Sequence, residues 1–140
     1  DGLAHRMSVV AEVGGVRFVD DSKATTPHAT LAAVAGYPGA VLIAGGRNKG
    51  LDLSTLAGAR PRAVVAIGEA ASEIASAFKG RCPVQIAESM REAVEAAAAQ
   101  SGAGGTVLLS PACASFDWYG SYEERGLEFT HVVAEMEKRR

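Results

Sequence analysis

The sequence predicts an α/β fold: a Rossmann-like, mostly parallel sheet with helices on both faces and an N-terminal β-hairpin. Two β-rich runs, residues 7–13 and 16–20, are joined by Gly14-Gly15, which is typical of a hairpin. After the hairpin, short continuous apolar runs alternate with helical patterns, as in a parallel sheet that is covered on both faces. The expected strands of that sheet are residues 40–44, 62–67, 84–86 and 106–109.

The expected helices carry clear start signals. Thr26 can cap a helix that has Pro27 at its first position, and Ser89 and Ser121 open capping-box patterns. Apolar residues then recur at helical spacing, which predicts one buried stripe in each of two helices: Met90, Ala93, Val94 and Ala97, and Phe129, Val132, Val133 and Met136. Gly126 interrupts the last helix at a cost of about 1 kcal/mol relative to alanine, which indicates a close backbone approach.

Composition restricts the class of protein. The 140 residues predict a single domain, 1–140, and the 48% apolar and 21% charged content is that of a soluble globular protein. A net charge of −2 without a run of five like charges argues against nucleic acid and membranes as partners. No apolar stretch approaches about 20 residues, and no signal peptide opens the chain. The start at Asp1-Gly2, without methionine, hints at a fragment.

The two cysteines, Cys82 and Cys113, are too few for a disulfide framework and lack metal-ligand spacing. Both lie in apolar sequence, so we expect buried thiols in a reducing cytoplasm and no protein-bound metal. His5, His28 and His131 fall in unrelated elements and suggest no catalytic triad.

Three strand-to-helix junctions, residues 20–26, 44–50 and 110–117, are rich in polar and small residues. Ligands of open sheets bind at the carboxyl ends of the strands, so these junctions are expected to share one edge. Lysine and arginine, hydroxyl groups and glycine backbone together favour a small anionic ligand. The residues that offer them are Lys23, Arg47, Lys49, Ser22, Thr25, Thr26, Ser110, Ser115, Gly45, Gly46 and Gly50.

Several of the residues at these junctions could have a role in the fold instead of in ligand binding. Thr26 is favoured as a helix cap over a ligand, and Ser115 could cap whatever follows it. Asp21 could pair with Lys23 on the surface, whereas Asp20 or Asp21 could also hold a ribose, a metal or an amine. Gly45-Gly46 could be a simple turn, and it lacks the spacing of a P-loop.

The motifs resemble a known family. They are Gly-Leu-Ala-His-Arg at 2–6, Asp-Ser-Lys-Ala-Thr at 21–25, Gly45-Gly46 with Lys49, Leu-Ser-Pro-Ala-Cys-Ala-Ser-Phe-Asp at 109–117, and Tyr122 with Glu-Arg-Gly at 124–126 and Glu-Phe at 128–129. Across essentially the whole chain they resemble the C-terminal, amino-acid-binding domain of the Mur ligases of peptidoglycan synthesis, in the branch that adds D-glutamate. Other Mur ligases and the folylpolyglutamate synthetases share the fold and differ in these loops.

The resemblance implies a part of a cytoplasmic, monomeric ligase that uses ATP and Mg²⁺. Such a ligase converts the carboxylate of UDP-N-acetylmuramoyl-L-alanine into an acyl phosphate, which the amine of D-glutamate then attacks. The family's first domain binds UDP, and its central domain carries the P-loop and the residues that hold Mg²⁺. The C-terminal domain supplies the amino acid and closes over ATP. Because the P-loop is missing here, the isolated chain is expected to be inactive.

The resemblance also implies roles for individual residues. Five residues match the positions that hold D-glutamate: Thr25, Lys49, Ser115, Phe116 and Tyr122. Thr25 and Lys49 would receive one carboxylate, and Ser115 and the Phe116 backbone would hold the other. Lys23 would lie near the acyl phosphate and the amine, as the catalytic residue. His5, Arg6 and Asp21 would contact ATP. Tyr122 stands where the family often has phenylalanine, and Thr26 replaces a common asparagine; neither Arg47 nor Asn48 receives a role.

Two other functions compete with this interpretation. A stand-alone Rossmann-like nucleotide-binding domain would need a Gly-x-Gly-x-x-Gly after a strand, and the sequence has none. A non-catalytic interaction domain would need a large exposed apolar patch.

Overall fold

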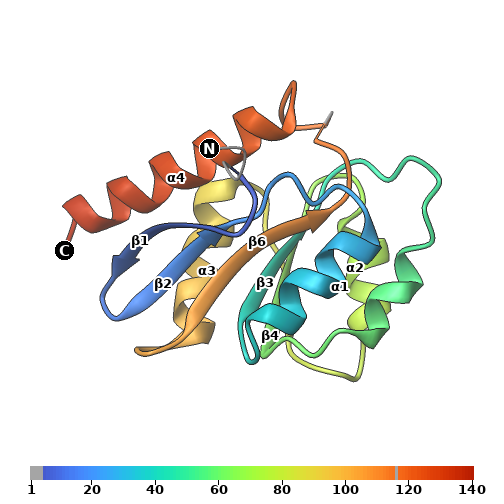
Figure 1. Cartoon of the computed structure of the whole chain (residues 1–140), viewed down its shortest axis with the longest axis horizontal. Coiled ribbons are helices and arrows are strands. Elements are labelled where there is room, and N and C mark those ends of the chain that lie inside the picture. Colours follow the sequence, from blue (N-terminus) through green and yellow to red (C-terminus); the bar gives the residue numbers. More distant parts are fainter. Residues whose placement is uncertain (1–4, 116) are drawn as a thin grey trace.

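A computed structural model describes residues 5–115 and 117–140. It contains one six-stranded sheet in the order β1-β2-β6-β3-β4-β5 (Figure 1). Only β1 is antiparallel to its neighbour among the described strands, which confirms the mostly parallel sheet and the N-terminal hairpin. The strands are β1 (Ser8–Val13), β2 (Val16–Asp20), β3 (Val41–Gly45), β4 (Ala63–Ile67), β5 (Val84–Ile86) and β6 (Thr106–Ala112).

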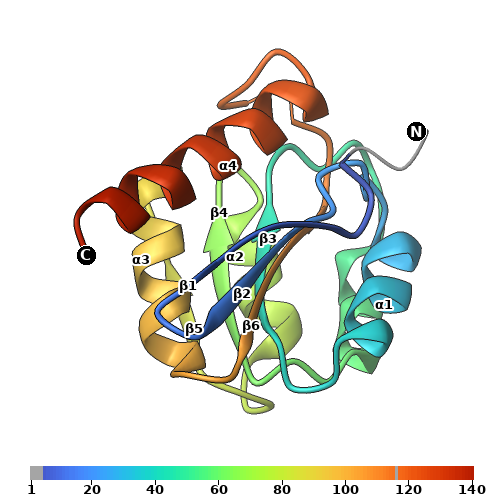
Figure 2. The same ribbon diagram turned by 60° about the vertical axis from the view of Figure 1, so that its left-hand side comes forward.

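Helices cover both faces of the sheet, as predicted (Figure 2). The helices are α1 (Pro27–Gly36), the 3-10 helix η1 (Leu53–Gly58), α2 (Ala71–Phe78), α3 (Met90–Ser101) and α4 (Tyr122–Lys138). One core lies between the sheet and α3 with α4, and the other lies between the sheet and α1, η1 and α2. No helix within the described ranges is long and apolar enough to cross a membrane.

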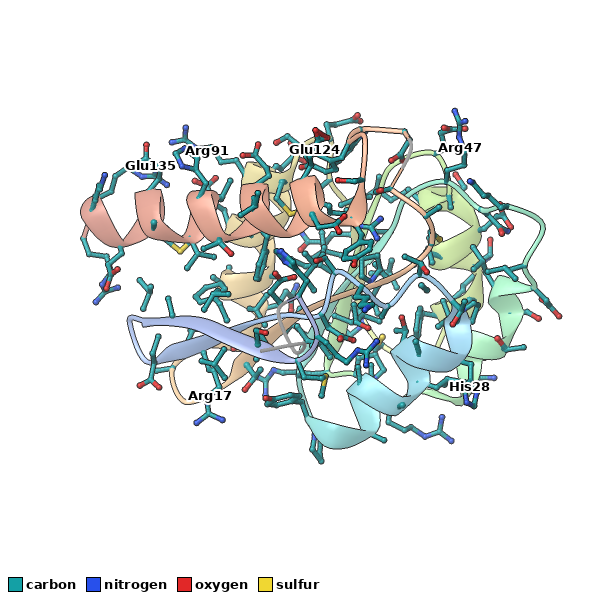
Figure 3. All side chains as sticks on the ribbon, turned by 45° about the horizontal axis from the view of Figure 1, so that its top comes forward. Arg17, His28, Arg47, Arg91, Glu124 and Glu135 are labelled. Carbon is teal, nitrogen blue, oxygen red and sulfur yellow. The ribbon has the colours of Figure 1, made fainter. Side chains whose placement is uncertain are left out.

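The predicted helix starts are confirmed in their hydrogen bonds. The hydroxyl oxygens of Thr26, Ser89 and Ser121 accept from the main-chain N–H three residues later, at 3.3, 3.1 and 3.2 Å. The predicted stripe of α3 is fully buried, and so are Phe129, Val132 and Val133 of α4, whereas Met136 is half-buried. His28 and His131 are exposed, and His28 points away from the sheet (Figure 3).

Strand β6 is longer than predicted. It continues past Leu109 through Ser110 and Pro111 to Ala112, although proline is normally a turn signal. The register between β6 and β3 shifts at this point, and Ala112 adopts a left-handed φ of 65°. A bulge of this kind accommodates a proline in a central strand, because the proline does not need to donate to the ladder.

Smaller differences concern short segments. The sequence did not predict η1, a single short 3-10 helix that Asp52 caps by accepting from the Ser54 N–H. Cys113 is buried as predicted, but Cys82 is only half-buried, and neither forms a disulfide. In β1, the edge strand, the register shifts between Val9 and Ala11, which is a second bulge.

Candidate ligand-binding site at the carboxyl edge of the sheet

Three loops leave the same edge of the sheet, because β2, β6 and β3 are parallel neighbours. We call residues 21–26 the first loop, 46–52 the second loop and 113–121 the third loop. The third loop lies between the other two. The Ala112 N–H donates to the Ala24 carbonyl at 2.9 Å, and Arg47 and Ala114 exchange two main-chain hydrogen bonds of 2.8 and 3.1 Å. The predicted convergence of the three junctions is therefore confirmed.

Asp21 is buried rather than paired with Lys23 on the surface, so the surface-pair interpretation is wrong. One carboxylate oxygen accepts from the Met7 N–H at 3.1 Å, and the other accepts from the Ser110 hydroxyl at 2.9 Å. Burial raises the pKa of Asp21 above its ordinary value, and these two hydrogen bonds oppose that shift. Ser110 belongs to β6, so its hydroxyl holds the first loop to the central strand.

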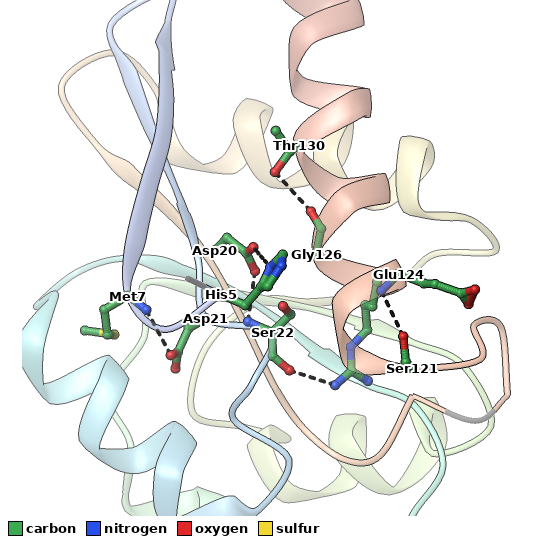
Figure 4. Close-up of polar contacts among 10 residues, drawn as sticks. His5, Met7, Asp20, Asp21, Ser22, Ser121, Glu124, Gly126 and Thr130 are labelled. Atoms are coloured by element: carbon green, nitrogen blue, oxygen red, sulfur yellow. Dashed lines mark hydrogen bonds and ion pairs between the residues drawn. The ribbon is translucent and has the colours of Figure 1, made fainter. Parts of the chain in front are cut away.

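Asp20 joins the start of the described chain to α4 (Figure 4). Its carboxylate pairs with His5 Nδ1 at 2.7 Å and accepts from the Ser22 N–H at 2.9 Å. Gly126 packs directly on this group, since a Cβ there would collide with His5, Ser22 and Asp20. The close backbone approach that the sequence indicated at Gly126 is thus confirmed, and its cause is the buried Asp20 network.

His5 also contacts Tyr122, the first residue of α4, with ring centroids 6.2 Å apart and planes at 77°. This edge-to-face contact joins a residue of the implied ATP set to a residue of the implied D-glutamate set. Partial burial and the neighbouring Glu123 raise the pKa of the Tyr122 phenol, so its hydroxyl is protonated and can donate at neutral pH.

A surface hollow of about 330 Å³ lies beside the first loop. One part of its wall is apolar, and the other part carries a carboxylate and two cationic side chains. This combination suits a ligand with an apolar ring, a hydroxyl group and an anionic end. The lining residues are Arg6, Met7, Asp21, Lys23, Ala24, Ala29, Ala32 and Ala33.

The second and third loops present the remaining predicted residues. Lys49 is exposed on the second loop, Thr25 is half-buried on the first, and Ser115 is buried on the third. The Ser115 carbonyl accepts from the Asp117 and Tyr119 N–H groups at 2.7 and 3.1 Å, so Ser115 organises its own loop. Phe116 lies outside the described residues, and its predicted role stays a prediction.

Asp117 ties the third loop to the segment just before α2. Its Oδ2 accepts from the Glu69 N–H at 3.0 Å, next to the start of a helix whose own N-cap residue, Ala70, makes no side-chain cap. Its Oδ1 accepts from the Trp118 N–H at 2.6 Å. A carboxylate near a helix N-terminus is favourable, so this contact stabilises both the helix start and the loop.

Arg125 also lies at the carboxyl edge of the sheet, and the sequence analysis assigned it no role. It is 1% exposed, and its Nη2 donates to the Ser22 carbonyl at 3.1 Å and to the Cys113 carbonyl at 3.0 Å. Burial lowers its pKa to about 10, so the guanidinium is still charged at neutral pH. Arg125 therefore clamps the first loop to the third from α4. The only sequence signal was its place between Glu124 and Gly126, in a motif that carried no role.

The Cys113 thiol beside this clamp is not a nucleophile. Burial raises its pKa to about 12, which keeps it protonated at neutral pH. Within residues 5–115 and 117–140, no group of three His, Cys, Asp or Glu side chains is arranged to hold a metal ion.

Comparison with protein-family profiles decides the family. Residues 5–113 match the profile described as "Mur ligase, glutamate ligase domain". The chain belongs to the Mur ligase family. The match includes all the first-loop and second-loop residues discussed above, together with His5 and Arg6.

Two relatives of this Mur ligase domain share a name. A protein of Frankia casuarinae named UDP-N-acetylmuramoylalanine–D-glutamate ligase is 51% identical over 140 residues, and one of Chlorobaculum parvum with the same name is 45% identical over 139 residues. Each match covers 96% of this chain and 30% of the relative. The chain thus spans about a third of the length of these relatives.

Solved structures of the family share the fold. UDP-N-acetylmuramate-alanine ligase from Thermotoga maritima matches with a TM-score of 0.64 at 13% identity, over 94% of this chain and 30% of that chain. A murein peptide ligase from Psychrobacter arcticus matches with a TM-score of 0.61 at 15% identity, over 90% and 30%. At this level of identity the likeness supports the Mur ligase fold of the domain and nothing finer.

Proposed function

We propose that this Mur ligase domain binds D-glutamate and closes over ATP in a ligase that joins D-glutamate to UDP-N-acetylmuramoyl-L-alanine through an acyl phosphate. The observation that carries the proposal is the convergence of the three loops. They bring the hollow lined by Arg6, Asp21 and Lys23 to the same sheet edge as Lys49 and Ser115. The relatives' shared name supplies the substrates.

The hollow fits the nucleotide. Its alanine wall and Met7 accept the flat, weakly polar base and the ribose carbons. Asp21 has further lone pairs beyond the two hydrogen bonds that it accepts, so it can take a ribose hydroxyl. Arg6 and Lys23 supply positive charge for the phosphates. His5 supports this side indirectly, through Asp20 and Tyr122.

The second subsite fits the amino acid. D-Glutamate carries two carboxylates, and we assign a donor set to each: Lys49 with Thr25, and Ser115 with the Tyr122 hydroxyl and, as the family resemblance implies, the Phe116 backbone. Lys23 lines the nucleotide hollow and belongs to the first loop, which also carries Thr25. Two separate donor sets would hold the amine in one orientation, which lowers the entropic cost of its attack.

The chemical step that we propose is amide formation from the acyl phosphate. The amine lone pair attacks the acyl carbon and a C–N bond forms. The C–O bond then breaks, and phosphate leaves with the proton that the amine gives up. The Lys23 ammonium would stabilise the charge that develops on the acyl phosphate oxygens. We therefore assign Lys23 as the catalytic residue of this domain.

Mg²⁺ does not fit the described residues. In the part of the chain that the structure describes, no cluster of three His, Cys, Asp or Glu side chains is arranged to hold a metal ion. We propose that the rest of the full-length ligase holds the metal and the P-loop, so that this domain alone does not catalyse ligation. The full-length ligase would act in the cytoplasm, as a monomer.

The test is Lys49→Ala in the full-length ligase. Removal of one partner of a desolvated charge pair costs roughly 2–5 kcal/mol, so the KM for D-glutamate should rise about 30-fold to several thousand-fold while the KM for ATP changes little. A solvated lysine would cost at most about 1 kcal/mol, which is less than tenfold. Steady-state kinetics with each substrate varied in turn separates the two.

Lys138→Ala is the matched control, because Lys138 is 78% exposed near the end of α4 and makes only a 3.8 Å pair with Glu135. It should leave both KM values unchanged. If a folded Lys49→Ala enzyme has the wild-type KM and kcat for D-glutamate, then Lys49 does not bind the substrate and the proposed amino-acid subsite is wrong.

A further inference from the structure

Lys49 lies in a turn that the side chain of Asn48 closes. Residues 48–51 form a four-residue loop in which Gly50 has a φ of +84°, a conformation that favours glycine. The Leu51 N–H donates to Asn48 Oδ1 at 2.8 Å, and Asn48 Nδ2 donates to the Leu51 carbonyl at 2.8 Å. The Asn48 amide therefore makes both bonds that fix the ends of the turn, and Lys49 follows it directly.

Helix α2 holds this asparagine in place. Asn48 Nδ2 also donates to Glu73 Oε2 at 3.0 Å, and Glu73 lies in the first turn of α2. The amide oxygen accepts from Leu51, and the amide nitrogen donates to Leu51 and to Glu73, so three hydrogen bonds to two residues fix the orientation of the side chain. An asparagine with these contacts cannot rotate without breaking the turn.

The preceding residue adds a second attachment, to the segment just before the same helix. Arg47 Nε and Nη2 both lie 2.9 Å from Glu69 Oε2, and the Arg47 backbone pairs with Ala114 of the third loop. Glu69 also donates its N–H to Asp117. Glu69, just before the N-cap of α2, thus anchors both the loop that carries Lys49 and the loop that carries Ser115.

We propose that Asn48 is a positioning residue for the amino-acid substrate: with Glu73 it fixes the turn that presents Lys49 to a substrate carboxylate. The inference rests on the proposed role of Lys49. The Asn48–Glu73 hydrogen bond fixes the backbone from which the long, flexible Lys49 side chain extends. It thereby reduces the number of positions that the Lys49 ammonium group samples. Loss of the bond lowers affinity for the carboxylate without removing the charge.

The first test uses Asn48→Ala and Asn48→Asp in the full-length ligase. Asn48→Ala should raise the KM for D-glutamate about three- to tenfold, the size of about one net hydrogen bond, with kcat, the KM for ATP and the Tm unchanged. Asn48→Asp should raise it further, because a second carboxylate then faces Glu73. A wild-type KM for D-glutamate in both variants would overturn the proposal.

Two double variants complete the test: one exchanges the carboxylate and the amide between positions 48 and 73, and the other combines Asn48→Ala with Lys49→Ala. In Asn48→Asp/Glu73→Gln the glutamine amide can donate to the new carboxylate, so the KM should fall back below that of Asn48→Asp alone. In a Lys49→Ala background, Asn48→Ala should have no further effect. Failure of the exchange to rescue, or an undiminished effect without Lys49, contradicts positioning through Lys49. An inert Lys49→Ala would instead contradict the proposed function itself.

Discussion

The first and second loops leave the same sheet edge, but different interactions hold them. At the first loop, Asp21 and the preceding Asp20, the last residue of β2, are 4% and 2% exposed and accept hydrogen bonds from buried donors. At the second loop, the Arg47 side chain and that of its partner Glu69 are 48% and 55% exposed. A buried polar group that loses its partner costs about 1–3 kcal/mol, whereas an exposed ion pair contributes about 0–1 kcal/mol. Mutations in the first loop should therefore change stability and binding together, and those in the second should change binding alone.

The largest effect is expected at Gly126, which packs on the first-loop network. Gly126→Ala would gain about 1 kcal/mol in helix propensity. Its Cβ would, however, overlap His5, Ser22 and Asp20, and overpacking costs about 1–3 kcal/mol before the lost hydrogen bonds are counted. We expect the free energy of unfolding to fall by about 2 kcal/mol in urea titrations. Leu127→Ala, at the exposed position beside it, should stay within about 0.5 kcal/mol. A Gly126→Ala protein as stable as wild type would mean that the network is not rigid.

A smaller, pH-dependent effect is expected at Asp21. Burial raises the folded-state pKa above the ordinary value of 3.8, so as pH falls the folded state takes up the proton before the unfolded state does. The contribution of Asp21 to stability therefore decreases as pH rises from that value through the raised pKa. Asp21→Asn removes this titration. Urea unfolding from about pH 7 to about pH 4 should show wild type gaining stability relative to Asp21→Asn; a difference that is constant or shifts the other way would contradict a buried Asp21.

The smallest effect is expected at Arg47. Arg47→Ala removes an exposed ion pair, so the free energy of unfolding should change by at most about 1 kcal/mol. Arg91→Ala removes a comparable exposed pair with Glu95 on α3, far from Arg47 (Figure 3), and should behave alike in the same urea titration. A loss above about 2 kcal/mol for Arg47→Ala alone would show that the second loop is as integral to the fold as the first.

Local patterns predicted most of the fold. The hairpin around Gly14-Gly15 and the caps at Thr26, Ser89 and Ser121 depend on residues within a few positions of each other, and all were confirmed. The end of β6 was not predicted, because Pro111 looks like a turn unless the bulge against β3 is known. Local rules describe a residue's neighbours in sequence, and a bulge depends on the neighbouring strand.

The sequence predicted the loops of the candidate site but not the residues that hold these loops in place. The convergence of the loops followed from the parallel order of the strands. The burial of Arg125 did not, since charged residues in a first helical turn are usually solvated. Asn48 and Glu73 are 25 residues apart and meet only once β3 and β4 have paired. Such supports depend on tertiary contacts that no single motif encodes.

The bulge in β1 has a consequence for the behaviour of the domain at high concentration. An edge strand with a regular row of free N–H and C=O groups is a template on which another chain can add a strand. Here the register shift between Val9 and Ala11 interrupts that row at one edge, and β5 at the other edge is only three residues long. Neither edge of the sheet offers a long, regular row of free N–H and C=O groups. A strand of another chain therefore has little to pair with, and the domain should resist growth into a fibril.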